Sequence, residues 1–294
     1  MQNPFRRGVF PHIARVLAPY VIDADEPEKV VYSRVVGEAR RRLFEGKSVE
    51  AYDWDDIVAQ VATELYGLPG RTRAVGPCAP ALGEPPHLPP SLDVGMLVRH
   101  YCAQPGMVWS LPGAHEALRA LKDRGHILVV VSNGYHKYQI PVMEALGIAR
   151  YFSDIYTPEQ VGAAKPASGI FHAAWRHEPE PIHVGDDIIH DGYGARAAGG
   201  YSVWLYRNTP EEIRTRTGAG VLPEQRPSAD WFPAVRDRAY AATWAVESYG
   251  VAADDCVPDA LIWDLEELPA LVDRLEEERS RGGSRRALYA AQHL

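Results

Sequence analysis

The sequence predicts an α/β fold with a parallel sheet core that follows a set of N-terminal helices. Two buried strands support this prediction: the apolar run 127–131 ends in Ser132-Asn133-Gly134, and the run 182–184 ends in Gly185-Asp186-Asp187. Helix-like segments separate them, and strands that alternate with helices of this length are typical of βαβ units. Ligands bind outside the carboxyl ends of such strands, so we expect the chemistry at that edge of the sheet.

The composition is that of an ordinary soluble globular protein. The 294 residues are 46% hydrophobic and 24% charged, and their number allows one sizeable core and a smaller domain. A formal charge of −8 argues against a nucleic-acid partner, which requires a basic patch. Three widely spaced cysteines (Cys78, Cys102 and Cys256) form no CxxC pair, which favours a reduced, cytoplasmic setting. No apolar run approaches the ~18–20 residues of a membrane span, so we expect no membrane partner. The oligomeric state does not follow from these properties.

The N-terminal third of the chain is expected to be mostly helical. Apolar residues recur at helical spacing in 10–17, 30–44 and 54–65. The stretch 70–112 is rich in proline and glycine, and it predicts an irregular connection with a short helix at 92–102.

Beyond this connection, helices and strands alternate. In chain order we expect a helix at 114–124, a strand at 127–131, a helix at 141–146, a strand at 155–156, a helix at 170–176, a strand at 182–184, a helix at 191–198 and a strand at 202–206. An insertion at 208–257 with a helix at 239–249 follows, and then a strand at 258–263 and a helix at 265–275.

Three acids follow the second buried strand closely: Asp186, Asp187 and Asp191. Carboxylates between a strand and the next helix suit Mg²⁺, which binds one or two carboxylates together with the phosphate oxygens of a substrate. The alternative is an aspartate that caps the helix. A cap accounts for one acid but not for three, so we predict a magnesium site formed by these residues.

The turn after the first strand suits an anion. Ser132 can donate a hydrogen bond to a phosphate oxygen, and the N–H groups of Asn133 and Gly134 lie at a helix start, where anions bind. Lys165, just before Pro166, can place a positive charge on the same phosphate. Taken singly, these residues are better explained as a turn and a surface lysine. Together, and in this order, they predict a site for a small phosphorylated substrate.

These three groups of residues resemble a known family. Ser132-Asn133-Gly134, Lys165-Pro166 and the stretch from Gly185 to Asp191 look like the second, third and fourth motifs of the haloacid dehalogenase-like hydrolases. The resemblance covers 108–207, and 258–275 looks like the family's closing strand and helix. It implies a Rossmann-like parallel sheet core with an N-terminal helical cap, and an activity as a magnesium-dependent phosphohydrolase.

The family's first motif, Asp-x-Asp-x-Thr at the end of a strand, is matched only by Asp23-Ala24-Asp25. The resemblance makes Asp23 the nucleophile and Asp25 the general acid/base. Only three apolar residues precede Asp23, however, and Glu26-Pro27 stand in place of the turn and threonine. The alternative puts both aspartates in a loop between cap helices, with the catalytic strand upstream of Met1. On that reading the sheet lacks its central strand, and two neighbouring strands keep unpaired edges.

The leading hypothesis is a phosphohydrolase that acts on a small phosphorylated metabolite through an aspartyl-phosphate, with Mg²⁺ as cofactor. The alternative is a non-catalytic relative that binds a phosphate or a partner and lacks the nucleophile. A dehalogenase fits less well, because that reaction needs no magnesium and leaves the three acids without a function. The predicted domains are a helical cap and linker at 1–107, the core at 108–207, an insertion at 208–257, and a closing strand, helix and tail at 258–294.

Overall fold

The computed structural model describes residues 3–21, 24–67, 92–176, 178, 181–208, 211 and 231–280. The chain forms two compact units, each built from several segments. The first comprises Met1–Ser110, Val129–Arg176 and Glu247–Tyr249, and the second comprises Leu111–Leu128, His177–Val246 and Gly250–Leu294. The division between units runs through the predicted core, so each unit carries part of the α/β region. The four-part division drawn from the sequence stays a prediction.

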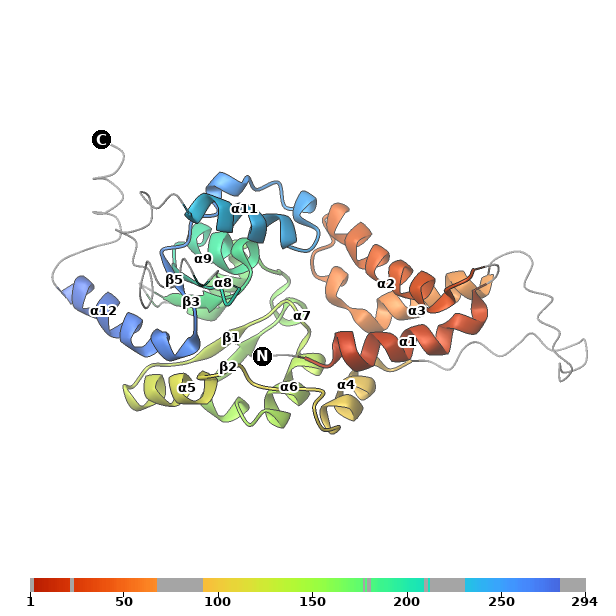
Figure 1. The fold of residues 1–294 in the computed structure, drawn as a ribbon, viewed down its shortest axis with the longest axis horizontal. Coiled ribbons are helices and arrows are strands. Elements are labelled where there is room, and N and C mark those ends of the chain that lie inside the picture. Colours follow the sequence, from red (N-terminus) through yellow and green to blue (C-terminus); the bar gives the residue numbers. More distant parts are fainter. Residues whose placement is uncertain are drawn as a thin grey trace, which may run out of the picture. The chain divides into compact units, whose positions relative to one another are not determined.

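The first unit begins with helices and continues into a parallel strand pair (Figure 1). In chain order its elements are η1 (Phe5–Val9), α1 (Phe10–Leu17), η2 (Ala18–Tyr20), α2 (Pro27–Phe44), η3 (Glu50–Tyr52), α3 (Trp54–Gly67), α4 (Val94–Cys102), β1 (Val129–Val131), α6 (His136–Ala145), η4 (Ala149–Tyr151), β2 (Asp154–Tyr156), α7 (Pro158–Val161) and α8 (Ser168–Trp175).

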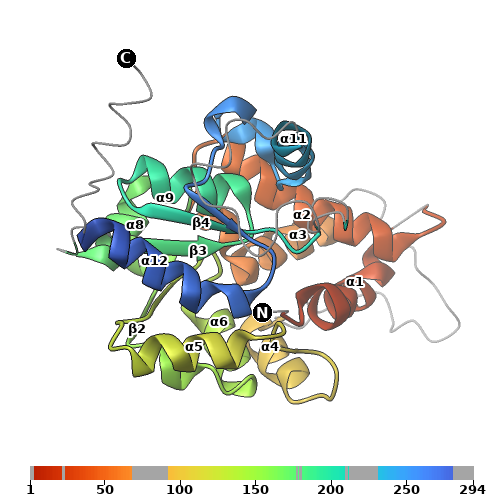
Figure 2. The same ribbon diagram turned by 60° about the vertical axis from the view of Figure 1, so that its left-hand side comes forward.

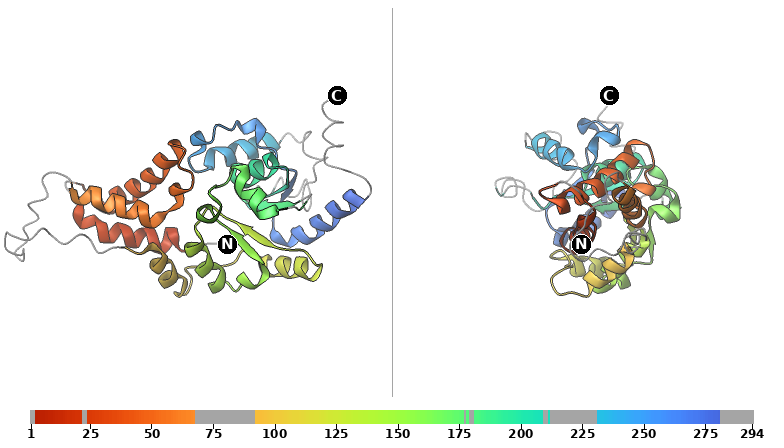
Figure 3. Two further views of the ribbon diagram at one scale, coloured as in Figure 1. Left: turned by 180° about the vertical axis from the view of Figure 1, so that it is seen from behind. Right: turned by 90° about the vertical axis from the view of Figure 1, so that its right-hand side faces the viewer.

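The N-terminal helices α1, α2 and α3 pack against one another, as Figures 1 and 3 show. On α1 the buried residues are Ile13, Ala14 and Leu17, which form the apolar stripe of an amphipathic helix. α2 begins at Pro27, where the first turn needs no N–H donor. The predicted helical N-terminal region is confirmed. In the part of the chain that the structure describes, no helix combines the length and the apolarity that crossing a membrane requires.

A buried charge joins α2 to α3. Arg42 is 3% exposed. Its Nε lies 2.8 Å from Glu38, on the same helix, and its terminal nitrogen lies 2.6 Å from Asp56 on α3. Because a buried charge is tolerated only with such partners, this network fixes how the two helices pack.

The strands β1 and β2 pair in parallel, with Val130 opposite Ile155. β1 consists of three valines, whose branched side chains suit a pleated strand. α8 packs against both strands and buries Ile170 and Phe171 completely. The predicted strand–helix–strand unit is therefore present, and it sets the Ser132 turn at the carboxyl end of β1.

The second unit holds the remaining strands and their helices. Its elements are α5 (Ala114–Asp123), β3 (Ile182–Gly185), η5 (Ile188–Tyr193), α9 (Gly194–Ala197), β4 (Tyr201–Leu205), α11 (Phe232–Ala242), η8 (Ala253–Asp255), β5 (Ala260–Ile262), η9 (Leu265–Glu267) and α12 (Leu268–Ser280). The short helix η7 (Val246–Ser248) lies at the boundary between the two units.

A parallel sheet in the order β3-β4-β5 forms the centre of the second unit. Successive residues of a strand point to opposite faces. Val203 and Leu205 of β4 therefore share one core with α5 and α12, and α12 runs beside the strands in Figure 2. Trp204 lies between them in sequence, and its Nε1 donates to the main-chain oxygen of Asp186 at 3.1 Å. The predicted parallel α/β core is confirmed.

Several helices begin earlier than the sequence pattern predicts, and three of them show why. α6 starts at His136 and keeps Pro141 in its interior, because Tyr138 and Gln139 are buried on its first turn. The turn after β3 becomes helical at Ile188 rather than at Asp191. α11 covers 232–242 instead of 239–249. Tertiary packing, rather than local propensity, sets these boundaries.

The two sheets share no strand. Among the described residues, β1 pairs with β2 alone and β3 pairs with β4 alone. One edge of each of these strands therefore has no hydrogen-bonded neighbour in that part of the chain. Every open sheet has such edges, so the absence of a central strand stays a prediction.

Candidate active site

The Ser132 turn lies at the carboxyl end of β1 in the first unit. The main-chain N–H of Ser132 donates to the carbonyl of Tyr156 at 3.0 Å, which extends the β1–β2 pairing by one residue. Its hydroxyl oxygen accepts from the N–H of Gly134 at 3.1 Å. The hydroxyl proton is not used in that bond, so Ser132 can donate it to an anion.

Another side chain covers Gly134. A Cβ built on Gly134 would overlap the amide nitrogen of Gln139, which is buried on the first turn of α6, so a larger residue would have to displace that amide. Gln139 also has a buried Oε1 atom with no hydrogen-bond partner. The sequence analysis did not identify Gln139, since its contact with Gly134 depends on where α6 begins.

Asn133 joins the Ser132 turn (Ser132-Asn133-Gly134) to the lysine loop, which contains Lys165 and Pro166. Its Oδ1 accepts from the main-chain N–H of Lys165 at 2.7 Å, and its Nδ2 donates to the main-chain oxygen of Lys165 at 3.0 Å. The same Nδ2 also donates to the hydroxyl of Tyr52 at 3.0 Å. The Lys165–Pro166 peptide bond is cis. The predicted phosphate-binding residues therefore come together within one compact unit.

The start of helix α6 is occupied by a carboxylate. The N–H of His136 donates to Glu159 of α7 at 2.6 Å. Anions favour a helix N-terminus, and here the chain supplies its own. At this helix start, a phosphate could therefore bind only to the turn before the helix. In that turn the N–H of Gly134 already donates to the hydroxyl oxygen of Ser132.

Residues 49–55 contact the segment 133–138 through several polar side chains that the sequence did not single out. The pairs are Tyr135 with the Val49 carbonyl, Asn133 with Tyr52, Tyr138 with Asp55, and Lys137 with Asp55. Burial and the nearby Asp55 carboxylate raise the pKa of Tyr138, so it stays a neutral phenol. These contacts hold the N-terminal helical region against the Ser132 turn.

In the second unit, Asp191 is a structural centre of the turn after β3. Its side chain is buried, and its Oδ1 lies 2.9 Å from Nε2 of His183. Its Oδ2 accepts from the main-chain N–H of Asp187 at 3.0 Å. A Cβ on Gly185 would overlap this carboxylate, which explains the glycine before the acids. A histidine within a buried strand is the signal that could have revealed this pair.

Asp187 caps the helical turn η5. Its Oδ1 accepts from the N–H groups of Ile189 and His190 at 2.9 and 2.8 Å. Its Oδ2 lies 3.2 Å from Nδ1 of His190. Burial alone would raise the pKa of Asp187, but the hydrogen bond and charge of His190 lower it below its usual range. The capping alternative weighed from the sequence therefore describes Asp187.

Asp186 is the exposed member of the three acids, directly after β3. Across the described residues, no three His, Cys, Asp or Glu side chains are arranged to hold a metal ion. Asp187 and Asp191 bind main-chain N–H groups and histidines, whereas Asp186 is exposed; the magnesium site at these acids stays a prediction, with Asp186 as the accessible ligand. Such an ion would take its other ligands from water and phosphate oxygens, which is common for Mg²⁺.

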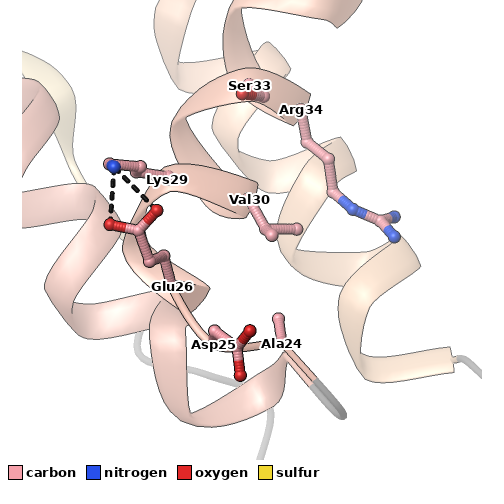
Figure 4. A pocket seen from close by; sticks show the side chains of 7 residues that line it. All are labelled: Ala24, Asp25, Glu26, Lys29, Val30, Ser33 and Arg34. Carbon is pink, nitrogen blue, oxygen red and sulfur yellow. Dashed lines mark hydrogen bonds and ion pairs between the residues drawn. The ribbon is translucent and has the colours of Figure 1, made fainter.

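The candidate nucleophile region lies between two helices. Asp23 is outside the described residues, and Asp25 lies in the loop between η2 and α2. Figure 4 shows Asp25 beside a pocket of about 460 Å³ at the start of α2, where Lys29 pairs with Glu26. The pocket is lined by Ala24, Asp25, Glu26, Lys29, Val30, Ser33 and Arg34. None of the predicted phosphate-binding residues is among them, so the catalytic roles of Asp23 and Asp25 stay a prediction.

The predicted site residues fall into two groups. Ser132, Asn133, Gly134 and Lys165 belong to the first unit, and the three acids belong to the second. That both groups bind one phosphate stays a prediction.

A family model described as a haloacid dehalogenase-like hydrolase matches residues 92–199. The matched region holds β1, β2 and β3, the Ser132 turn, the lysine loop and the three acids.

Three similar proteins carry names that describe an activity or a family. A haloacid dehalogenase-like hydrolase domain-containing protein 3 from Xenopus laevis is 35% identical over 111 residues, which is 36% of this chain and 45% of that protein. A pyrimidine 5'-nucleotidase from Escherichia coli is 33% identical over 35% of this chain and 49% of its own length. A glyceraldehyde 3-phosphate phosphatase from Methanothermobacter thermautotrophicus is 32% identical over 37% of this chain and 49% of its own length. The chain spans about half the length of these relatives.

Proposed function

The chain belongs to the haloacid dehalogenase-like hydrolases, and from that premise we propose that it hydrolyses a phosphate ester of a small metabolite with the help of Mg²⁺. One observation carries this proposal: the Asn133 side chain ties the Ser132 turn to the Lys165 main chain, so a hydroxyl donor and a cationic residue come from two joined loops.

In this proposal Ser132 and Lys165 bind and orient the phosphoryl group. The Ser132 hydroxyl accepts from Gly134 and donates its own proton to a phosphate oxygen. The ammonium of Lys165 offsets the charge of the phosphate as a compact point charge. Asp186 holds Mg²⁺, which when bound lowers the charge on the phosphate oxygens and so eases attack on phosphorus.

The names of the relatives support a phosphate ester as the substrate class. Of the three similar proteins, one is a pyrimidine 5'-nucleotidase and one is a glyceraldehyde 3-phosphate phosphatase. Both names describe the removal of phosphate from a small molecule. We propose the same class for this chain and assign no single substrate.

Hydrolysis through an aspartyl-phosphate also needs an in-line carboxylate and a group that protonates the leaving oxygen. In this chain Asp23 is the candidate nucleophile and Asp25 the candidate acid/base. The second candidate function is phosphate binding without turnover. It is favoured by the position of Asp25 between two helices rather than at the end of a strand.

A trapping experiment separates the two functions. Wild-type protein with Mg²⁺ and beryllium fluoride is expected to give a bound ¹⁹F NMR signal and to hydrolyse p-nitrophenyl phosphate, and both are expected to disappear in Asp23→Asn. The exposed Asp123 on α5 supplies the control variant Asp123→Asn, which should change neither. Bound phosphate without turnover or trapping would favour the non-catalytic function. A protein that neither binds nor hydrolyses phosphate would refute both.

A further inference from the structure

The amide of Asn133 makes three hydrogen bonds within the first unit, and two of them go to one residue. Its Oδ1 and Nδ2 bind the N–H and the C=O of Lys165, which is 32 positions away. The remaining hydrogen of Nδ2 goes to Tyr52, which is 81 positions away. Both donor hydrogens of the amide are therefore committed.

We propose that Asn133 is a positioning residue that fixes Lys165 for phosphate binding, and that Tyr52 holds the Asn133 amide in the required orientation. The inference rests on the proposed function, since it concerns the same phosphate-binding loops.

The two bonds to Lys165 fix its main chain on both sides of Cα. An N–H and a C=O of the same residue, bound by one planar amide, leave that residue little freedom to rotate. The Lys165 side chain starts from this Cα, so the direction of its ammonium depends on the bond pair. The two bonds also determine the orientation of the Asn133 amide. In the reversed orientation two donors would meet, Nδ2 and the Lys165 N–H, and two acceptors would meet, Oδ1 and the Lys165 carbonyl.

A direct role of the Asn133 side chain in binding phosphate is disfavoured by the same contacts. Neither hydrogen of Nδ2 remains for an anion, and Oδ1 would repel one. The influence of this side chain on phosphate must therefore pass through Lys165. A purely structural role is the remaining alternative, and it predicts a different outcome in the experiment below.

The test is a double-mutant cycle on the affinity for inorganic phosphate, measured by titration calorimetry on the full chain at fixed Mg²⁺. Asn133→Leu keeps nearly the same side-chain volume, adds no charge and removes the hydrogen bonds to Lys165 and Tyr52. Lys165→Met removes the charge. We expect Asn133→Leu to weaken phosphate binding about tenfold in the parent protein and less than about twofold in the Lys165→Met background, because coupled residues are not additive.

Tyr52→Phe serves as a second, milder variant in case Asn133→Leu does not fold. It removes one hydroxyl and keeps the ring. We expect a loss of about two- to threefold in phosphate affinity, again only when Lys165 is present. The exposed Lys122 on α5 supplies the charge control, and Lys122→Met should bind phosphate as the parent does.

The outcomes are distinct. Equal losses in both backgrounds, or no loss in either, would overturn the positioning role while leaving the phosphate-binding loops intact. If Lys165→Met itself binds phosphate as tightly as the parent, or if the parent does not bind it, the proposed function fails and the inference fails with it.

Discussion

The carboxylate of Asp191 accepts a hydrogen bond from the main-chain N–H of Asp187 at 3.0 Å, across the turn that follows β3. The bond closes this turn upon itself, and the second carboxylate oxygen is held by His183 at 2.9 Å. Asp191 is 5% exposed, so both bonds form away from bulk water. The turn therefore presents Asp186 from a rigid frame, and Asp187 and Asp191 have separate structural functions.

Asp191→Asn should destabilise the protein, whereas Asp186→Asn should not. The asparagine loses the charge-assisted hydrogen bond to His183, and it keeps both contacts only if His183 changes its tautomer so that Nε2 accepts. We expect a loss of about 2 kcal/mol in the free energy of unfolding, measured with urea. Asp186 is exposed, so its substitution should change stability by less than about 0.5 kcal/mol. Equal stability of the two variants would contradict the assigned roles.

Gly185→Ala should displace the Asp191 side chain. The added Cβ would overlap the carboxylate, which His183 and Asp187 hold in place. We expect a loss of about 2 kcal/mol, in the range for overpacking of a buried site. Gly37→Ala is the matched control, because a Cβ at that helical position meets nothing and should stabilise α2 by up to about 1 kcal/mol. If Gly185→Ala leaves the free energy of unfolding unchanged, the turn can move to make room for the added Cβ, and the overlap argument is wrong.

Glu38→Gln should give a pH-dependent loss of stability. Arg41 and Arg42 hydrogen-bond the Glu38 carboxylate, and the bond from Arg41 is the main cause that lowers its pKa, although burial opposes the shift. A lowered pKa stabilises the folded state above the usual glutamate value of about 4.3, and this contribution disappears as the pH falls through the folded-state pKa.

The measurement for Glu38→Gln is urea unfolding at two pH values. We expect the variant to lose about 2 kcal/mol at pH 7. At pH 3 the difference from the parent should become smaller. Glu144→Gln, at an exposed position of α6, is the control and should differ little at either pH. A constant difference between pH 3 and pH 7 would mean that the Glu38 charge contributes no stability.

Removal of divalent metal should abolish turnover of p-nitrophenyl phosphate, and added Mg²⁺ should restore it. The same addition should not restore activity in Asp186→Asn, because Asp186 is the acid that we propose as the ligand of the ion. Initial rates after dialysis against EDTA, with and without Mg²⁺, give the measurement. Undiminished turnover in EDTA would remove the magnesium part of the proposed function.

The sequence predicted the fold well where the signal was local. The valines of β1 and the apolar residues of β3 predicted two buried strands, and the small or acidic residues after them predicted the site edge. Asp187 is the instructive case among the acids. Its capping geometry was one of two local interpretations, and only the hydrogen bonds to Ile189 and His190 distinguish it from a metal ligand.

The contacts between the site residues could not be predicted from the sequence, because they join positions that are far apart in the chain. Nothing local links Asn133 with Lys165 or Tyr52, and nothing local indicates that Glu159 meets the start of α6. The early start of α6 also depends on contacts between positions that are far apart in the chain. Tyr138 is buried there by contacts with 49–55, which a helical periodicity search does not detect.

The hydrogen bonds of Asn133 have a consequence for deamidation of this chain. An asparagine followed by glycine is prone to lose ammonia, when the glycine nitrogen attacks the side-chain carbonyl carbon and the resulting ring opens to aspartate or isoaspartate. In the folded protein the Gly134 nitrogen is bound to Ser132, and the Asn133 amide is bound on both sides. We therefore expect Asn133 to keep its side-chain amide while the chain is folded and to lose it in the unfolded chain. Protein refolded after long denaturation should then carry an acidic residue in the Ser132 turn, without the donor to the Lys165 carbonyl.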